Sequence, residues 1–138
     1  MAGGRGITRF GIDALTALRL AEDRVVVAPE HRLVAPNLLR SHAMSHLYRS
    51  VRRGERTDKE GLALLERLAG LKIRLLGDRV SRSTAWKIAA QLDWPDTAAA
   101  EYLAVAKLQA DKFVTLDPEL AAVAAEFVPT AAITELSG

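Results

Sequence analysis

The 138-residue chain contains no cysteine, only three histidines, and aromatic residues at just 5% of its length. Without cysteine there is no disulfide bond and no thiol-ligated zinc site, a pattern typical of proteins from a reducing cytoplasm. No apolar run approaches the roughly 20 residues that a membrane-spanning helix needs. The first ten residues also lack the apolar core of a signal peptide. These absences predict a soluble, cytoplasmic protein with no membrane partner.

The residues that are present are those of a globular protein. The chain is 49% hydrophobic and 26% charged, and its length suits one domain over residues 1–138. The formal net charge is only +2, but 14 of the 19 basic residues are arginine. The planar arginine side chain suits phosphate recognition, although an arginine-rich codon bias produces the same count. The charge therefore permits an RNA partner without requiring one.

Hydrophobic periodicity and turn residues divide the chain into alternating strands and helices. Thr57 and Glu60 form a capping box, Ser81 or Ser83 can cap a helix, and Pro118 suits a first helical position. The expected strands are 8–13, 71–77, 112–117 and an edge strand at 128–133. A further strand is expected at the end of the extended segment 25–36. The expected helices are 14–24, 37–53, 58–69, 84–94, 97–110 and 118–127.

This alternation predicts an α/β fold with a mostly parallel central sheet and helices on both faces. In such sheets ligands bind outside the carboxyl ends of the strands, where the strand order reverses. Two acids follow strands directly, namely Asp13 after "RFGI" and Asp117 after "KFVTL". Carboxylates brought together repel one another unless a cation neutralises them, so the pair suggests a magnesium site. The alternative is that both aspartates only cap the helices that follow.

Three stretches of the chain resemble the PIN-domain family, and within it the VapC-type toxins of bacterial toxin-antitoxin pairs. They are "FGIDALTALRL", "LVAPNLLRSHAMSHLY" and "AAAEYLAVAKLQADKFVTLDPEL". The resemblance implies a three-layer α/β/α domain with magnesium-dependent ribonuclease activity. It also implies a homodimer that is held inactive by a VapB-type antitoxin.

The resemblance places two of the family's four acids on Asp13 and Asp117. The hydroxyl residue that orients the last acid falls on Thr115. The other two acidic positions are occupied by His42 and Ala99. An imidazole in place of a carboxylate weakens magnesium binding and favours manganese.

Asp96 lies one helical turn before Ala99 and could supply the missing carboxylate, or it could cap its own helix. His42 could contact metal or substrate, or it could be a hydrogen-bonded structural residue. His42 and His46 have ligand spacing, but no third donor accompanies them. Arg40 lies on the helix of His42 and could hold an RNA phosphate. Arginines at 49, 52, 53 and 56 either complement the helix dipole or contact phosphate.

Two hypotheses follow from these residues and the resemblance. The first is a metal-dependent endoribonuclease, the toxin half of a type II pair, in which Asp13, Asp117 and Asp96 hold Mg²⁺ or Mn²⁺. The second is a degenerate PIN domain that binds antitoxin or RNA without cleaving it. Dimerisation through the helical face of "LLERLAGLKIRLL" would be compatible with either.

Overall fold

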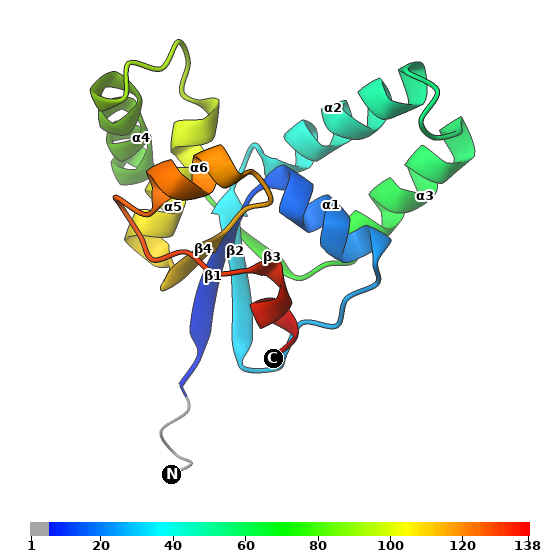
Figure 1. Ribbon diagram of the computed structural model, residues 1–138, viewed down its shortest axis with the longest axis horizontal. Helices are drawn as coiled ribbons and strands as arrows, with labels where there is room; N and C mark the ends of the chain where they lie inside the picture. Colours follow the sequence, from blue (N-terminus) through cyan, green and yellow to red (C-terminus); the bar gives the residue numbers. More distant parts are fainter. Residues whose placement is uncertain (1–5) are drawn as a thin grey trace.

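The computed structural model describes residues 6–138, so the first five residues of the opening stretch lie outside it. Strands and helices alternate along the chain as Figure 1 shows. The strands are β1 Thr8–Ile12, β2 His31–Pro36, β3 Ile73–Leu76 and β4 Lys112–Val114. The helices are α1 Ala14–Glu22, α2 Leu39–Arg52, α3 Asp58–Ala69, α4 Arg79–Gln91, α5 Ala98–Gln109 and α6 Pro118–Ala124, followed by the short 3₁₀ helix η2 Ile133–Ser137.

The four strands form one sheet in the order β3-β2-β1-β4, and every neighbouring pair is parallel. Helices α4 and α5 lie on one side of the sheet and α1, α2 and α3 on the other (Figure 1). The predicted α/β class with a parallel sheet and three α/β/α layers is thereby confirmed. Among residues 6–138, no helix combines the length and the apolar character needed to cross a membrane.

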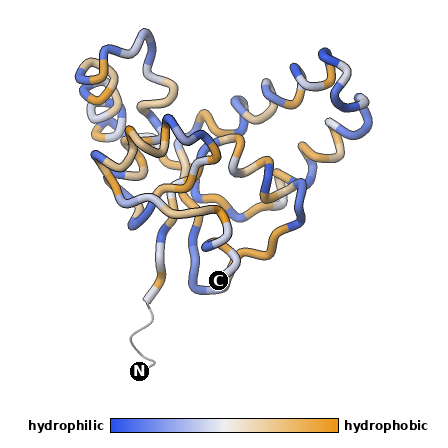
Figure 2. Tube along the Cα trace, in the orientation of Figure 1, coloured by the Kyte–Doolittle hydropathy of each residue, from blue (hydrophilic) through white to orange (hydrophobic). Residues whose placement is uncertain are grey.

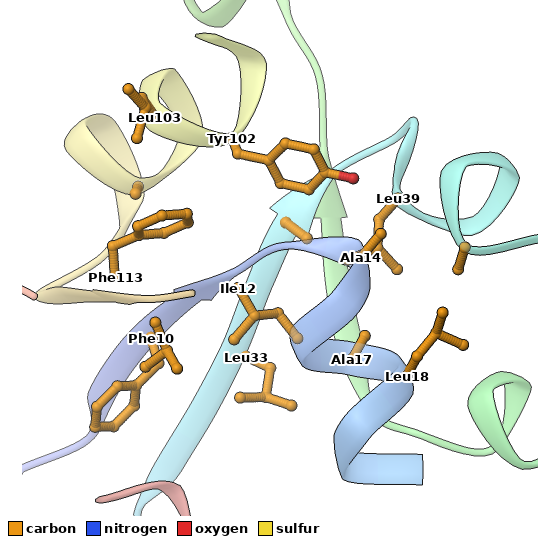
Figure 3. Close-up of a cluster of buried hydrophobic side chains, with 14 of the residues drawn as sticks. Phe10, Ile12, Ala14, Ala17, Leu18, Leu33, Leu39, Tyr102, Leu103 and Phe113 are labelled. Carbon is orange, nitrogen blue, oxygen red and sulfur yellow. The ribbon is translucent and has the colours of Figure 1, made fainter. Parts of the chain in front are cut away.

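The two faces of β1 bury different kinds of residue. Phe10 and Ile12 point into the main apolar core, where they are 2% and 0% exposed (Figure 3). Gly11 faces α5 instead, and a Cβ there would lie only 2.9 Å from the Cβ of Ala106. The missing side chain therefore lets α5 pack directly on the strand.

The strand order reverses between β1 and β4. The chain builds β1, β2 and β3 outward in one direction and then returns to place β4 on the other side of β1. Ile12 at the end of β1 pairs with Val114 at the end of β4. The residues that follow these strands, Asp13 and Thr115, therefore emerge side by side at the point where open α/β sheets bind ligands.

The main differences from the predicted elements are an edge strand, the start of α4 and the end of β4, which stops at Val114 instead of continuing to Asp117. The segment 128–133, expected to be an edge strand, forms only a single β-bridge between Phe113 and Thr130. Its backbone hydrogen bonds to Phe113 do not continue along β4 as a ladder. Helix α4 begins earlier than predicted, because Asp78 caps it and Ser81 completes the capping box from the third helical position. The capping box predicted at Thr57 and Glu60 is confirmed.

Helices α2 and α3 form a hairpin that projects from the sheet, and the loop joining them is strongly hydrophilic (Figures 1 and 2). Leu64 and Leu68 of α3 are 2% and 1% exposed, because they pack into the core of their own chain. The face of "LLERLAGLKIRLL" that carries them is thus not free for dimerisation. The hairpin instead exposes Met44, Tyr48 and Leu62.

Candidate functional site

A hollow of about 270 Å³ opens at the switch point between β1 and β4. The three aspartates considered as metal ligands, Asp13, Asp96 and Asp117, all line it. The remaining lining residues come from α1, α2, α5 and α6: Ala14, Leu15, His42, His46, Ala98, Ala99, Tyr102 and Leu120. We call this hollow the acidic pocket.

Asp13 is the most rigidly held of the three aspartates. It is 9% exposed and is the N-cap of α1. Its Oδ1 accepts hydrogen bonds from the backbone N–H of Thr16 at 3.0 Å and from the Thr16 hydroxyl at 2.7 Å. Its Oδ2 accepts a hydrogen bond from the Thr115 hydroxyl at 2.5 Å. Three donors therefore fix the carboxylate from two sides.

Thr115 joins the two strand-end aspartates, in a way that differs from the expectation. The resemblance assigned its hydroxyl to orienting Asp117, whereas the hydroxyl donates to Asp13 and accepts from the backbone N–H of Asp117 at 3.2 Å. The reason is the register of β1 and β4, which places the end of one strand beside the end of the other. Thr115 therefore positions the carboxylate of Asp13 and the backbone of Asp117.

Asp117 and Asp96 are exposed, and each also binds the start of a helix. Asp117 caps α6, and its Oδ1 accepts from the backbone N–H groups of Glu119 at 2.9 Å and Leu120 at 3.4 Å. Asp96 accepts from the backbone N–H of Ala98 at 3.1 Å, at the first position of α5. Capping and pocket lining are thus not alternatives here, because a carboxylate at a helix start at the sheet edge does both.

His42 reaches the pocket from α2 and is hydrogen-bonded within the chain. Its Nδ1 lies 3.0 Å from the Tyr102 hydroxyl, and the two rings stack with centroids 5.8 Å apart. Tyr102 extends from α5 over the end of β1, as Figure 3 shows. Burial, reinforced by the charge of Asp13, raises the pKa of Tyr102 well above its usual range, so its hydroxyl stays protonated. The structure thus places His42 in the pocket and also gives it a structural partner.

Ala99 lines the pocket at the second position of α5 and presents a methyl group. Glu101 lies on the other side of α5, where it lines a separate hollow with Asn37 and Arg82. Arg40, expected to approach the site from α2, is not among the residues that line the acidic pocket.

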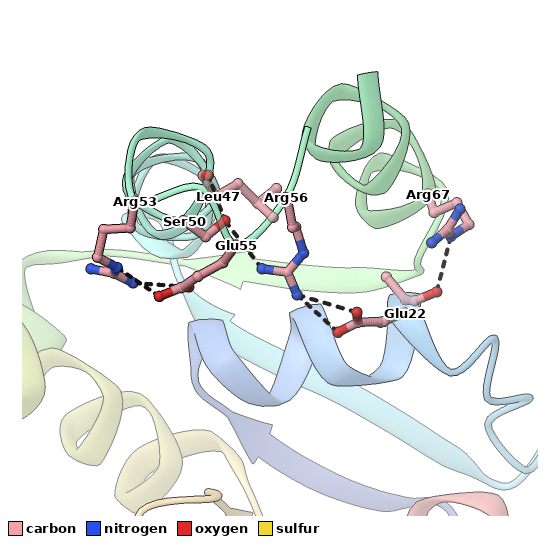
Figure 4. A network of polar contacts seen from close by, with 8 residues as sticks. Glu22, Leu47, Ser50, Arg53, Glu55, Arg56 and Arg67 are labelled. Carbon is pink, nitrogen blue, oxygen red and sulfur yellow. Dashed lines mark hydrogen bonds and ion pairs between the residues drawn. The ribbon is translucent and has the colours of Figure 1, made fainter. Parts of the chain in front are cut away.

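The arginines near the end of α2 are largely occupied by partners in the chain (Figure 4). Arg53 pairs with Glu55 at 2.9 Å, and Arg56 pairs with Glu22 of α1 at 3.1 Å while donating to the hydroxyl of Ser50. The pair of Arg56 with Glu22 joins the hairpin to α1. These contacts favour a structural role for Arg53 and Arg56 over contact with phosphate.

The donors of the pocket fit a magnesium ion only in part. Within residues 6–138, no group of three or more histidine, aspartate or glutamate side chains is placed so that it could hold a metal ion. Magnesium, however, is commonly held by one or two carboxylates together with water and substrate phosphate. The donor set does not fit an ion held by protein groups alone, so a cation at Asp13 and Asp117 would need water and a bound phosphate as further ligands.

We expect His46 to titrate below the ordinary histidine range. Burial lowers its pKa, and the charge of Arg49, whose guanidinium donates to His46 Nδ1 at 3.1 Å, lowers it further. The folded state then binds fewer protons than the unfolded state. The contribution of His46 to the free energy of unfolding is therefore full above the unfolded-state pKa of about 6.5 and is lost as the pH falls through the lowered folded-state pKa. An NMR titration of the imidazole ring measures this pKa.

The substitution Arg49→Gln should move the pKa of His46 part of the way back toward 6.5, while Arg52→Gln on the same helix should leave it unchanged. An unaltered pKa in Arg49→Gln would contradict the assigned contact.

Two groups of residues were missed from sequence. Tyr102 was not predicted to contact His42, because a separation of 60 residues in the chain leaves no local signal of their contact. It was also not predicted that Arg9, Arg32, Lys72 and Arg74 would line one hollow. The signal for the second group is a period of two, since Arg9 precedes Gly11 and Arg32 precedes Val34 on one face of the sheet.

Comparison with known proteins supports the fold alone. No family model matches the chain, and no curated protein matches it. Among solved structures the chain is similar to PAE2754 from Pyrobaculum aerophilum, with a TM-score of 0.72 over 95% of this chain and 93% of that one. The two sequences are 21% identical. At this identity the similarity establishes a shared architecture and leaves the function to be argued from the site.

Proposed function

We propose that the protein is the toxin half of a VapBC-type pair, a PIN-like domain that cleaves RNA with a divalent cation. The observation that carries the proposal is the meeting of Asp13 and Asp117 at the switch point, with Asp13 held by three donors. A fixed carboxylate costs little reorganisation when it takes up a cation. Mg²⁺, or Mn²⁺ given the imidazole of His42, is the ion that this donor set suits best.

The roles of the chain's own residues follow from their contacts. Asp13 and Asp117 would hold the cation, which supplies charge stabilisation and activated water for phosphodiester hydrolysis. Thr115 keeps the carboxylate of Asp13 in place. The hydroxyl of Tyr102 and the imidazole of His42 form part of the pocket wall, where the one that accepts in the hydrogen bond between them can donate its own hydrogen to an RNA oxygen. Asp96, which is exposed at the rim, is the candidate third acid.

Cleavage of total tRNA and rRNA by the purified protein tests the proposal. We expect cleavage in Mg²⁺ or Mn²⁺, none in EDTA, and a loss of about 100-fold or more in Asp13→Asn and Asp117→Asn, since removing a charge from a cation site costs several kcal/mol.

Asp78→Asn is the matched control, because Asp78 also caps a helix but lies outside the acidic pocket. This variant should cleave normally. Cleavage that survives both Asp13→Asn and Asp117→Asn would contradict the proposed site.

A second function, binding without cleavage, is favoured by Ala99 and by the absence of a three-donor group in residues 6–138. In this alternative the domain binds antitoxin or RNA, and its pocket does not catalyse phosphodiester cleavage. Tight antitoxin binding by a wild-type chain that cleaves nothing in either metal would favour it over the nuclease.

The groove between α2 and α3 is a suitable surface for the proposed antitoxin. Met44, Tyr48 and Leu62 expose 52%, 65% and 59% of their surface beside Leu47 and Leu65. An apolar groove of this kind accepts the apolar face of a helix. The proposed homodimer would need a different surface from the buried leucines of α3.

A further inference from the structure

A second hollow, of about 420 Å³, lies on the sheet and is lined by four cations. They are Arg9, Arg32, Lys72 and Arg74, and all four are exposed. Arg9 and Arg32 are the second residues of β1 and β2, and Lys72 directly precedes β3. This basic hollow therefore lies toward the starts of the strands, whereas the acidic pocket lies beyond their ends.

Strand register brings these cations together. Arg9 pairs with Arg32, and Arg74 pairs with Val34, two residues beyond Arg32 on the same face. That face is the one on which α5 packs at Gly11, so the cations lie beside the part that α5 covers. Neighbouring strands are about 4.8 Å apart, so the row spans about 10 Å across three strands.

Within residues 6–138, little neutralises the four cations of the basic hollow. The ion pairs among residues 6–138 involve Arg53, Arg56 and Lys112, and none involves a cation of the basic hollow. Arg32 donates only to backbone carbonyls, those of Pro29 and His31. At this edge the carboxylate of Asp111 accepts a hydrogen bond from the backbone N–H of Arg9 and not from its guanidinium. Like charges on neighbouring strands destabilise a sheet, so an anion bound here would reduce the repulsion between these cations.

The other lining residues indicate which part of a polyanion would bind. Ile7, Leu33, Val34 and Ile73 are aliphatic and offer no side-chain donor or acceptor to a base edge. Contacts from arginine and lysine to phosphate position a nucleic acid and carry no sequence information. We propose that the basic hollow binds the phosphate backbone of single-stranded RNA, independently of sequence and apart from the acidic pocket. The choice of RNA as the polyanion rests on the proposed function.

The test measures RNA affinity without cleavage. Fluorescence anisotropy of a labelled single-stranded RNA 20-mer, in EDTA, would be followed as a function of salt concentration. Arg32→Gln with Arg74→Gln should weaken binding about 10-fold or more at low salt and reduce the salt slope by about 1.4, at about 0.7 for each lost phosphate contact. Two RNAs of different sequence should bind alike.

The control Arg52→Gln with Lys59→Gln removes the same charge from the α2–α3 hairpin and should bind RNA normally. Equal weakening by both double variants would overturn the proposal, because binding would then follow net charge alone. Unchanged binding in Arg32→Gln with Arg74→Gln, or tighter binding of polyglutamate than of RNA, would also overturn it. Thermal melting confirms that each variant is folded.

Asp13→Asn with Asp117→Asn separates this inference from the nuclease. Because it removes two negative charges and leaves the basic hollow intact, this double variant should bind the 20-mer in EDTA at least as tightly as the wild type, even where cleavage is lost. Failure of the nuclease proposal thus leaves binding at the basic hollow intact, whereas loss of binding in Asp13→Asn with Asp117→Asn would place the RNA in the acidic pocket instead.

Discussion

The double variant Ala99→Asp with His42→Glu is expected to cleave RNA about 100-fold faster than the wild type, or faster still. Ala99 and His42 both line the acidic pocket with Asp13 and Asp117, so two new carboxylates there would complete the donor set that residues 6–138 lack. Stronger metal binding worth about 3 kcal/mol in the transition state corresponds to a factor of about 100.

The local structure can accept both changes. Ala99 is the second residue of α5, where a carboxylate interacts favourably with the helix dipole. A glutamate at 42 can accept a hydrogen bond from the protonated hydroxyl of Tyr102, which now contacts the imidazole. We therefore expect the variant to be folded and its melting temperature to change little.

The amide pair Ala99→Asn with His42→Gln is the control, since it matches the new side chains in size without adding charge. Initial cleavage rates at several Mg²⁺ concentrations compare the two variants. A similar gain in both would rule out the metal explanation. No gain in the acidic variant, despite measurable Mg²⁺ binding by calorimetry, would mean that the pocket lacks the geometry for catalysis.

The second large effect concerns stability. Asp13→Ala should lower the free energy of unfolding by about 2–4 kcal/mol, because it removes a helix cap and leaves two hydroxyls without their acceptor. The hydroxyl of Thr16 is fully buried and has only a weaker bond, at 3.3 Å, to the carbonyl of Val114 as a substitute. Denaturant unfolding measures the loss.

Asp117→Ala is the matched comparison, since Asp117 also caps a helix but is exposed. It should cost only about 1 kcal/mol, the usual value of a cap. A double-mutant cycle of Asp13→Ala with Thr115→Val should reveal coupling between the two residues. Equal losses in Asp13→Ala and Asp117→Ala would contradict the assigned importance of the buried contacts.

Much of this architecture could be predicted locally. The alternation of strands and helices indicated a parallel sheet, and acids directly after two strands indicated the edge at which they would lie. Capping was also predictable at Thr57, because a capping box depends on residues three positions apart. The edge strand predicted at 128–133 was wrong, because pairing there depends on the neighbouring strand β4, and the segment makes only a single bridge to it.

The sequence by itself determined the fold class and the edge of the sheet at which Asp13 and Asp117 lie. Only the tertiary structure decided what these residues contact. The strand order placed β4 beside β1, so Thr115 holds Asp13, and α5 brought Tyr102 to His42. The same register gathered the cations of three strands into one hollow. The physical reason is that periodicity and capping act over a few residues, whereas register joins residues far apart in the chain and leaves no local signal.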